Sequence, residues 1–476
     1  MKSNESAVKH FSLAESYQKK GNYAQALENF NLCLCYAPAK SKLIFDSLTN
    51  RSKIYYKVKQ YGRVLDNLNW AKEIKSMENG CTDLLEMLNT CKEEISRGTT
   101  AANATDFFQL TLPINERLPF VSACLELKQN DIYGRYFTTN KDLSPGDVIV
   151  AEEPFFKVVD STVCHLRCCI CCSTNLYSLI PCDNCSGAMF CSKECKSSSI
   201  HGRECEPSGK RMDTLEEYML QRMFYQAIEV CGGSMDELKA LVSSEAEQTT
   251  ILDFDFRHCT DDMNKRKIIL AVSGLDKRDP GSTETYSRYQ KIIDRLSTET
   301  AATGDFLENY LVRCLQSLTV NFFHFFWSAV NDAKPKGFLL CALSAFFSHS
   351  CDPNVEKVDV DNRLVFVAKR PIKAGEQLNM CYDRYNYMRY SLDERQSYLN
   401  EVYKFKCNCD ACANDYAKYN FKFDDHQLDV EKAKERYRKN CEYIKQNMST
   451  YPCQTICNVM EENVFLLSYI GNGMQF

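Results

Sequence analysis

The residues of this chain best suited to chemistry are its cysteines, which crowd into two short segments. The 476-residue sequence holds 27 cysteines, and ten of them fall between Cys164 and Cys205. Within that stretch, potential ligands recur in pairs separated by two or three residues, a spacing that lets a tight turn present two ligands to one tetrahedral ion. The pairs are Cys169/Cys172, with Cys168/Cys171 as an equally spaced alternative, then Cys182/Cys185, Cys191/Cys195 and His201/Cys205. Eight such ligands predict two closed zinc sites without an open catalytic position, whereas the alternative is a set of buried free thiols.

The compartment decides whether clustered cysteines form disulfides or bind metal. The first residues, MKSNESAVKHF, lack the apolar core of a signal peptide. The longest apolar stretch, residues 337–347, is far shorter than the ~20 residues that span a bilayer. We therefore expect an intracellular protein of the nucleus, the cytoplasm or both, in which thiols stay reduced and clustered cysteines indicate zinc.

Composition is that of an ordinary globular chain. Hydrophobic residues make up 44% and charged residues 25% of the sequence, which excludes a largely disordered chain. There are 58 Lys and Arg against 63 Asp and Glu, a net charge of −5. The chain therefore has no excess of positive charge that would indicate nucleic-acid binding. At about 150 residues per domain, the length predicts roughly three domains.

A second set of potential ligands, Cys407, Cys409 and Cys412, lies later in the chain. Three thiolates are one short of a closed tetrahedral site, so a fourth ligand must come from elsewhere. Cys351, in the segment His349–Asn354, is our candidate for that ligand. The alternative is a cluster of reactive or buried thiols.

The elements that must hold these ligands begin with a helical repeat. Residues 12–37 and 48–72 share a pattern in which Tyr23 and Tyr61 each precede an apolar helical face. The pattern resembles tetratricopeptide repeats (TPR), and a plain antiparallel helical bundle is the alternative. Because two repeats bury little apolar surface, we expect the amphipathic segment Leu84–Ile95 to cap them or to pack on the next domain.

After a small, polar linker at residues 97–112, we expect short strands on either side of a helical region. Strand patterns occur at Val148–Val150, Arg363–Ala368 and Gln377–Cys381. Helical patterns cover Leu215–Val230, Met235–Val242, Tyr286–Leu296, Phe306–Trp327 and, in the tail, Glu431–Gln446. Turn residues mark Leu143–Asp147 and a loop at Asp279–Ser282.

The first cysteine block resembles a MYND zinc finger. The step Phe190-Cys191-Ser192, the closing pair His201/Cys205 and the nine residues between Cys172 and Cys182 match that family. This gap favours Cys169/Cys172 as the first pair. MYND fingers bind zinc in a cross-braced fashion and usually dock proline-containing peptides. The resemblance therefore implies two ligand sets, Cys169, Cys172, Cys191 and Cys195 on one ion, and Cys182, Cys185, His201 and Cys205 on the other.

The residues around Cys351 and Cys407 resemble the SET-domain lysine methyltransferases. Phe347–Val355 is similar to the family's Asn-His-Ser-Cys loop, and Lys373–Tyr382 is similar to its Gly-Glu-Glu-Leu…Tyr strand. Cys407–Cys412, together with Cys351, resembles the family's post-SET zinc site. Tyr133–Tyr136 and Leu143–Glu153 resemble its opening hairpin. A MYND finger inserted in a split SET domain is the hallmark of the SET-and-MYND (SMYD) family. An N-terminal TPR segment is similar to one branch of that family.

This resemblance implies an α+β multidomain protein: a β-rich SET domain split by a MYND finger, with N-terminal helical TPR-like repeats and a short helical C-terminal tail. The expected divisions are 1–97 for the repeats, 98–117 for a linker, 118–163 for the first part of the SET domain, 164–206 for the finger, 207–330 for a helical insert, 331–400 for the SET core, 401–415 for the post-SET site and 416–476 for the tail.

The resemblance also implies the transfer of a methyl group from S-adenosylmethionine to a protein lysine, with three zinc ions. Tyr382 takes the main tyrosine role, and Tyr403 forms a second wall of the lysine channel. Contacts to the cofactor are implied for Gly134, Arg135 and Tyr136 in the opening loop, for Ser348, His349 and Tyr382, for Phe405 over the adenine and for Asn321 at the amino-acid end. For any single tyrosine the alternative is core packing, because the chain has 26 of them.

Two departures from the family pattern favour a second hypothesis. Tyr136 stands where the opening loop usually has a second glycine, and Ser348 stands where asparagine is usual. The alternative function is a catalytically weak or inactive scaffold that recruits partners in chromatin repression or as a chaperone adaptor. Under either hypothesis we expect a monomer, a protein substrate or partner, peptide partners for the finger and the repeats, and neither sequence-specific nucleic-acid binding nor a membrane partner.

Overall fold

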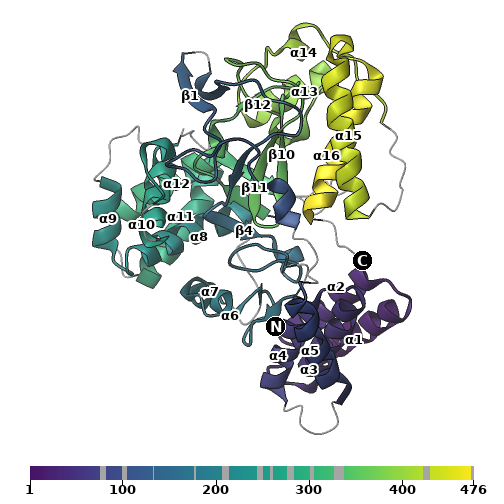
Figure 1. Cartoon of the computed structure of the whole chain (residues 1–476). Helices are drawn as coiled ribbons and strands as arrows, with labels where there is room; N and C mark the ends of the chain where they lie inside the picture. Colours follow the sequence, from purple (N-terminus) through teal and green to yellow (C-terminus); the bar gives the residue numbers. More distant parts are fainter. Residues whose placement is uncertain are drawn as a thin grey trace. The chain divides into compact units, whose positions relative to one another are not determined.

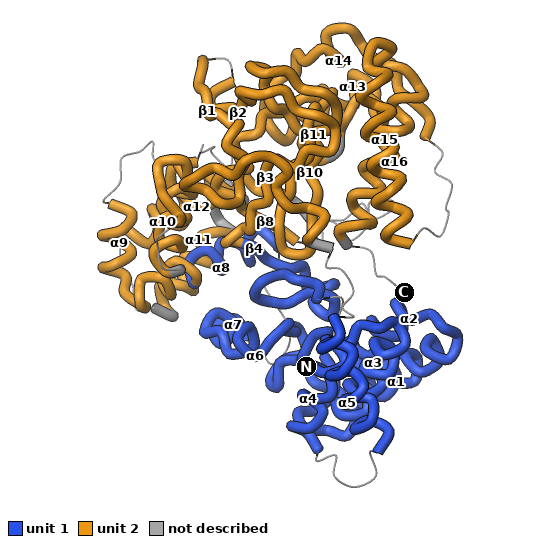
Figure 2. The backbone as a smooth tube through the Cα atoms, in the orientation of Figure 1, with its two compact units in different colours: residues 1–103, 157–225, 474–476 blue, residues 104–156, 226–473 orange. Residues whose placement is uncertain are grey.

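A computed structural model of the chain describes residues 1–75, 82–98, 104–131, 133–175, 178–205, 214–243, 250–257, 261–275, 283–300, 305–325, 337–421 and 429–472. These residues divide into two units, the first comprising 1–103 and 157–225 and the second comprising 104–156 and 226–473 (Figure 2). The segment that carries the first cysteine block therefore separates two stretches of the second unit.

The first unit begins with helical hairpins. Its helices are α1 (Asn4–Lys19), α2 (Tyr23–Tyr36), α3 (Lys42–Lys57), α4 (Tyr61–Ile74) and α5 (Thr82–Ser96) (Figure 1). The repeated tyrosines of the sequence are the first residues of α2 and α4. Gly21 adopts a φ of +77° in the turn before α2, a conformation that costs glycine little. The apolar face of α2 is fully buried at Leu27, Phe30 and Leu34.

The rest of the first unit holds short elements between cysteines. They are β4 (Phe156–Val159), which begins one residue before this unit, β5 (Ile180–Pro181), β6 (Met189–Phe190), α6 (Lys193–Lys196) and α7 (Ser199–Glu204). Helix α8 (Leu215–Val230) follows, and its residues after Tyr225 belong to the second unit. The pair β5–β6 is antiparallel, with Ile180 opposite Phe190. Elements this short bury little apolar surface, so bound metal would supply much of their folding free energy.

The second unit is built on small sheets. Its strands are β1 (Leu125–Asn130), β2 (Gly134–Thr139), β3 (Val148–Glu152), β7 (Phe322–Phe325), β8 (Gly337–Leu340), β9 (Ser348–His349), β10 (Val355–Val360), β11 (Arg363–Ala368) and β12 (Asn379–Met380). A three-stranded antiparallel sheet has the order β10-β11-β3, and β1 pairs with β2 and β7 with β8 as antiparallel hairpins. In contrast, β9 and β12 run parallel.

Helices surround these sheets. They are α9 (Met235–Ser243), α10 (Asp261–Ser273), α11 (Thr283–Thr300), α12 (Asp305–Asn321), α13 (Leu392–Val402), α14 (Asp410–Ala413), α15 (Val430–Asn447) and α16 (Gln454–Asn472). The last two pack on the sheet of β10 and β11 (Figure 1), where Tyr437, Leu466 and Ile470 share a core with Val358, Val360, Val365 and Val367. Within the described ranges, no helix is both long enough and apolar enough to cross a bilayer.

The predicted helices and strands are present, with two corrections. The helix expected over Phe306–Trp327 ends at Asn321, because Phe322–Phe325 pairs with β8 instead; Trp327 lies outside the described residues. The strand expected over Gln377–Cys381 is reduced to Asn379–Met380, and Gln377 forms only an isolated bridge with Thr138. The loop predicted at Asp279–Ser282 also lies outside the described residues.

Candidate cofactor cavity and metal centres

The parallel pairing of β9 with β12 brings two distant segments together. Ser348 lies opposite Asn379, and His349 lies opposite Met380. The side chain of Asn354 holds the same junction, since its Oδ1 accepts from the backbone N–H of Asn379 at 2.8 Å and its Nδ2 donates to the carbonyl of Gln377 at 2.8 Å. The loop after β9 is therefore anchored beside the strand that leads to Tyr382.

His349 links this junction to Tyr382 and to the last cysteine cluster. Its Nδ1 accepts from the backbone N–H of Tyr382 at 3.0 Å, and its Nε2 lies 3.3 Å from the Sγ of Cys351. Burial lowers the pKa of His349 to about 4. A neutral imidazole is consistent with the acceptor role of Nδ1.

Two cavities of the second unit meet at Tyr382. The larger one has a volume of about 640 Å³ and is lined by the loop after β9, by the strand before Tyr382 and by residues 405–410. The smaller one lies between the end of α12, β7 and the aromatic residues Tyr382 and Tyr403. Of the residues that line them, Tyr382 alone belongs to both.

Aromatic rings surround this junction. The centroid of the Tyr382 ring is 4.9 Å from that of Tyr403 and 5.0 Å from that of His349, and the His349 ring is 5.8 Å from Phe405. The Tyr382 hydroxyl donates to the carbonyl oxygen of Phe347 at 3.1 Å. The Tyr403 hydroxyl donates to the carboxylate of Asp383, and burial, followed by the charge of Asp383, raises the pKa of Tyr403. Tyr403 is thus held as a neutral phenol.

The structure divides the residues predicted to contact the cofactor into three groups. Ser348, His349, Tyr382 and Phe405 line the larger cavity. Asn321 lines the smaller cavity instead, together with Tyr403. Gly134, Arg135 and Tyr136 line neither of the two; their neighbour Tyr133 lines the larger one.

The contacts made by β2 explain why this third group of residues lines neither cavity. Tyr136 accepts a hydrogen bond from Asn130 Nδ2 at 3.2 Å, and its ring packs edge-on against Tyr133 at 5.9 Å. Arg135 donates to the carbonyl of Gly274 at 3.0 Å. The large side chain at position 136, a departure from the family pattern, is therefore held away from the cavity lining.

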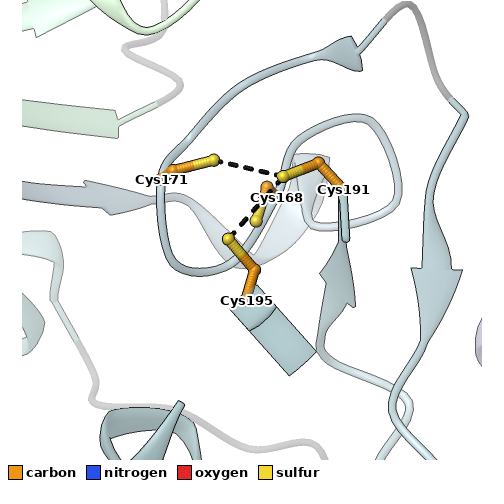
Figure 3. A group of neighbouring side chains, drawn as sticks. All are labelled: Cys168, Cys171, Cys191 and Cys195. Atoms are coloured by element: carbon orange, nitrogen blue, oxygen red, sulfur yellow. Dashed lines mark hydrogen bonds between the residues drawn. The ribbon is translucent and has the colours of Figure 1, made fainter. Parts of the chain in front are cut away.

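Cys168, Cys171, Cys191 and Cys195 converge in the first cysteine block (Figure 3). The sulfurs of Cys171 and Cys191 are 3.4 Å apart, and those of Cys191 and Cys195 are 3.7 Å apart. With a Zn–S bond of about 2.3 Å, two thiolates on one tetrahedral ion are about 3.8 Å apart. The four sulfurs therefore fit a zinc ion.

This cluster corrects the assignment of Cys169 and Cys172 as ligands. The backbone N–H of Cys169 bonds the carbonyl of Met189 at 2.7 Å, and the Cys169 sulfur lies 3.9 Å from Nδ1 of His201, outside the cluster. Cys172 has a left-handed backbone with a φ of 58°, and burial raises the pKa of its thiol to about 12. Residues 168–172 form a turn, closed by the N–H of Cys172 on the carbonyl of Cys168 at 3.0 Å, and this turn presents Cys168 and Cys171 to the cluster.

The second predicted ligand set is brought together as expected. The potential ligand atoms lie within 4.8 Å of one another in Cys182, Cys185, His201 and Cys205. His201 Nε2 is 3.2 Å from the Cys182 sulfur. A buried ion pair supports this cluster, because Arg222 bonds Glu204, the residue before Cys205, at 2.6 Å. Arg222 also donates to the carbonyl of Cys169 at 3.1 Å, which joins the two halves of the cysteine block.

The third cluster consists of Cys351, Cys407, Cys409 and Cys412, as the sequence predicts. The sulfurs of Cys351 and Cys412 are 3.5 Å apart, which again suits a tetrahedral ion. Cys351 lies in segment 348–354 and Cys407 and Cys409 lie in segment 405–410, and residues of both segments line the larger cavity. Cys412 follows two residues after the second segment. An ion here would cross-link those two segments.

Measuring the zinc content of serine variants distinguishes the two possible ligand pairs of the first cluster, Cys168/Cys171 and Cys169/Cys172. We expect about three zinc ions per wild-type chain and about two in Cys171→Ser, because that variant removes a thiolate from the first cluster. The matched variant Cys172→Ser is expected to keep about three, since its sulfur lies outside the cluster. A loss of one ion from Cys172→Ser with none from Cys171→Ser would restore the original assignment.

Comparisons with known proteins identify the class of protein. A sequence model of the SET domain matches residues 134–383, more than half of the chain. The chain belongs to the SET-domain family, and its relatives place it among the SET-and-MYND (SMYD) proteins of that family.

Three curated relatives illustrate the likeness. Histone-lysine N-methyltransferase ASHR1 of Arabidopsis thaliana is 24% identical over 61% of this chain and 55% of the relative. A SET and MYND domain-containing protein of Dictyostelium discoideum is 23% identical over 61% of this chain and 82% of the relative. Protein-lysine N-methyltransferase SMYD4 of Homo sapiens is 21% identical over 63% of this chain and 47% of the relative. The chain thus spans about half the length of the Arabidopsis and human relatives.

Two residues of the site carry little sequence signal of their position. Asp383 binds the hydroxyls of Tyr398 and Tyr403, and Tyr133 lines the larger cavity. A carboxylate directly after the strand tyrosine was the one available signal for Asp383. Tyr133 belongs to the hairpin motif Tyr133–Tyr136, but nothing in its spacing distinguishes it from Tyr136.

Proposed function

We propose that this chain transfers a methyl group from S-adenosylmethionine to the side-chain amine of a protein lysine. The observation that carries the proposal is that two cavities share Tyr382 as a lining residue. One cavity is large and largely polar, and the other is small and lined by aromatic side chains. A methyltransferase of this kind needs a cofactor site and a lysine site that open toward each other at the reacting atoms. The histone-lysine and protein-lysine methyltransferases among the relatives support the same reaction.

S-adenosylmethionine, when bound, would supply a methyl group activated by a positively charged sulfur. In the larger cavity, Ser348, His349 and Phe405 would bind it, with the loop after β9 held in place by Asn354. In the smaller cavity, Tyr382 and Tyr403 would exclude water and orient the lysine amine. Because the Tyr382 hydroxyl is tied to the Phe347 carbonyl, its oxygen is pre-oriented, which lowers the entropic cost of alignment.

We also propose that the three cysteine clusters bind zinc, two in a finger that recruits peptide partners and one beside the cofactor cavity. The donor sets support this, since four thiolates or three thiolates with one imidazole are typical of structural zinc. The domain boundaries expected from the sequence, the intracellular location and the recruiting role of the helical repeats remain parts of the same proposal.

Calorimetric titration of the full-length protein with S-adenosylmethionine, followed by transfer of labelled methyl groups to a protein mixture, tests the function. We expect binding in both wild type and Tyr382→Phe, and a loss of transfer by about 10²–10³-fold in the variant, because its oxygen no longer orients the amine. Tyr385→Phe is the control, since Tyr385 lines neither cavity. An absence of cofactor binding at high micromolar concentration would instead favour the scaffold hypothesis.

A further inference from the structure

The loop after β9 carries a buried carboxylate, Asp352, in the lining of the larger cavity, where the residue is only 8% exposed. Its backbone is closed on Ser350, whose hydroxyl accepts from the Asp352 N–H and donates to the Asp352 carbonyl, each at 3.0 Å. Ser350 lines the same cavity. Whatever fixes the side chain of Asp352 therefore also fixes the backbone that forms this part of the cavity wall.

Two groups from outside the loop contact this carboxylate. Its Oδ1 accepts a hydrogen bond from the hydroxyl of Tyr451, which lies in the connection between α15 and α16. Its Oδ2 lies 3.7 Å from Nη2 of Arg370, and the guanidinium of Arg370 is 5.9 Å from the centroid of the Tyr451 ring. A hydrogen bond to a carboxylate is stronger than one between neutral groups. The strongest hold on the Asp352 side chain thus comes from the C-terminal helices.

The Tyr451 hydroxyl is itself oriented by a second hydroxyl. It accepts from the hydroxyl of Tyr387 at 2.9 Å, and the Tyr387 oxygen lies 3.3 Å from the Cys457 sulfur. A phenol has a single hydrogen to donate. Since that of Tyr387 is given to Tyr451, the thiol of Cys457 is the donor to Tyr387. The chain of donors therefore runs in one direction, from α16 to the cavity wall, and ends on the carboxylate of Asp352.

The pair of helices α15 and α16 does not depend on this hydrogen bond for its own folding. One apolar core joins the two helices to the sheet of β10 and β11, and a second joins their connected ends to Cys351 and Tyr387. The loss of one hydroxyl leaves both cores in place. Removal of the Tyr451 hydroxyl is therefore expected to release the carboxylate without unfolding the helices.

We propose that Tyr451 is a positioning residue of the cofactor cavity, which fixes the loop of residues 348–352 through the carboxylate of Asp352. The C-terminal helices are then part of the cofactor site, although they contribute no residue to its lining. This inference rests on the proposed function only in taking S-adenosylmethionine as the occupant of the cavity; the order of the loop is a property of the cofactor-free protein.

Calorimetric titration of the full-length, zinc-loaded protein with S-adenosylmethionine measures the consequence for binding. We expect Tyr451→Phe, which keeps the ring and removes the hydroxyl, to bind the cofactor about tenfold more weakly, because a buried carboxylate loses a hydrogen bond. Tyr443→Phe is the matched control, since Tyr443 lies on α15 and is 39% exposed. This control is expected to bind the cofactor as wild type does.

A double-mutant cycle with Asp352→Ala shows whether Tyr451 acts through the carboxylate. We expect the double variant to bind S-adenosylmethionine within about twofold of the weaker-binding single variant, because both substitutions remove the same contact. Additive losses of affinity would give Tyr451 a structural role alone and would overturn the proposal. Wild-type affinity in Tyr451→Phe would overturn it as well.

Hydrogen exchange of the cofactor-free protein separates this positioning role from the proposed reaction. The backbone amides of residues 348–352 are expected to exchange at least threefold faster in Tyr451→Phe than in wild type or in Tyr443→Phe. Faster exchange in a protein that binds no S-adenosylmethionine would support the role of Tyr451 and count against the proposed function alone. Unchanged exchange in this loop would refute the role of Tyr451, whether or not the protein transfers a methyl group.

Discussion

Replacement of Arg51 by alanine is expected to lower the free energy of unfolding of the first unit by about 3–5 kcal/mol. Arg51, on α3, is fully buried, and burial lowers the pKa of its guanidinium to about 10, so it remains charged at neutral pH. Its Nη1 donates to Asn31 Oδ1 at 2.5 Å and to the carbonyl of Leu179 at 2.8 Å, and its Nε donates to Asn67 Oδ1 at 2.8 Å. The alanine variant would leave these buried acceptors without that donor.

The two asparagines extend the contact between the helical repeats and the cysteine block. Asn31 Nδ2 donates to the carbonyl of His165 at 2.7 Å, and Asn67 Nδ2 donates to the Ser178 hydroxyl at 2.7 Å. These acceptors flank the segment that carries Cys168 and Cys171. Folding of the repeats and metal binding by the first cluster are therefore expected to be coupled, and coupling of this kind is reciprocal.

Fluorescence of Trp70, which lies on α4, reports unfolding of the repeats in the full-length protein. The chain has two tryptophans, so Trp327→Phe makes Trp70 the single probe. In that background, Arg51→Ala is expected to unfold at a lower urea concentration and to release zinc faster to a chelator. Arg97→Ala is the control, because Arg97 pairs with Glu94 on the surface and its loss should change stability by less than about 0.5 kcal/mol. Unchanged zinc release in Arg51→Ala would show that the two parts are energetically independent.

Replacement of Cys412 by serine is expected to weaken S-adenosylmethionine binding by at least 100-fold. The cluster of Cys351, Cys407, Cys409 and Cys412 joins two segments that line the larger cavity. Without a metal ion, the three remaining thiols cannot hold these segments together, because structural zinc supplies much of the folding free energy of such short loops. The loss of order would reach the loop of Ser348 and His349, which begins three residues before Cys351.

Calorimetric titration of Cys412→Ser and of the matched variant Cys171→Ser with S-adenosylmethionine separates this local effect from general destabilisation. Cys412→Ser is expected to lose one zinc ion and its cofactor affinity together. Cys171→Ser is expected to lose one zinc ion as well but to keep its cofactor affinity, because its cluster belongs to the first unit and the cavity to the second. Equal cofactor affinity in Cys412→Ser and wild type would refute the structural role of the third ion.

Much of the site could be predicted from the sequence because its motifs are local. The pairs Cys182/Cys185 and His201/Cys205 are close in the chain, so short turns bring each pair together. The convergence of Cys351 with Cys407, Cys409 and Cys412 followed from the need for a fourth ligand and from the family pattern, and the structure groups the four sulfurs. The helical hairpins followed from the repeated tyrosines, which begin α2 and α4.

Contacts between distant segments were decided by packing alone. Cys168/Cys171 and Cys169/Cys172 have equal spacing, and the folded turn, which is bonded to Met189 through the N–H of Cys169, determines which thiols face the cluster. The end of α12 at Asn321 depends on the pairing of Phe322–Phe325 with β8, which overrides a helical pattern. Asp383 meets Tyr398 and Tyr403 only because α13 folds back over it. Spacing constrains residues within a turn or a helix, whereas partners many residues apart depend on the burial of whole elements, which no local pattern encodes.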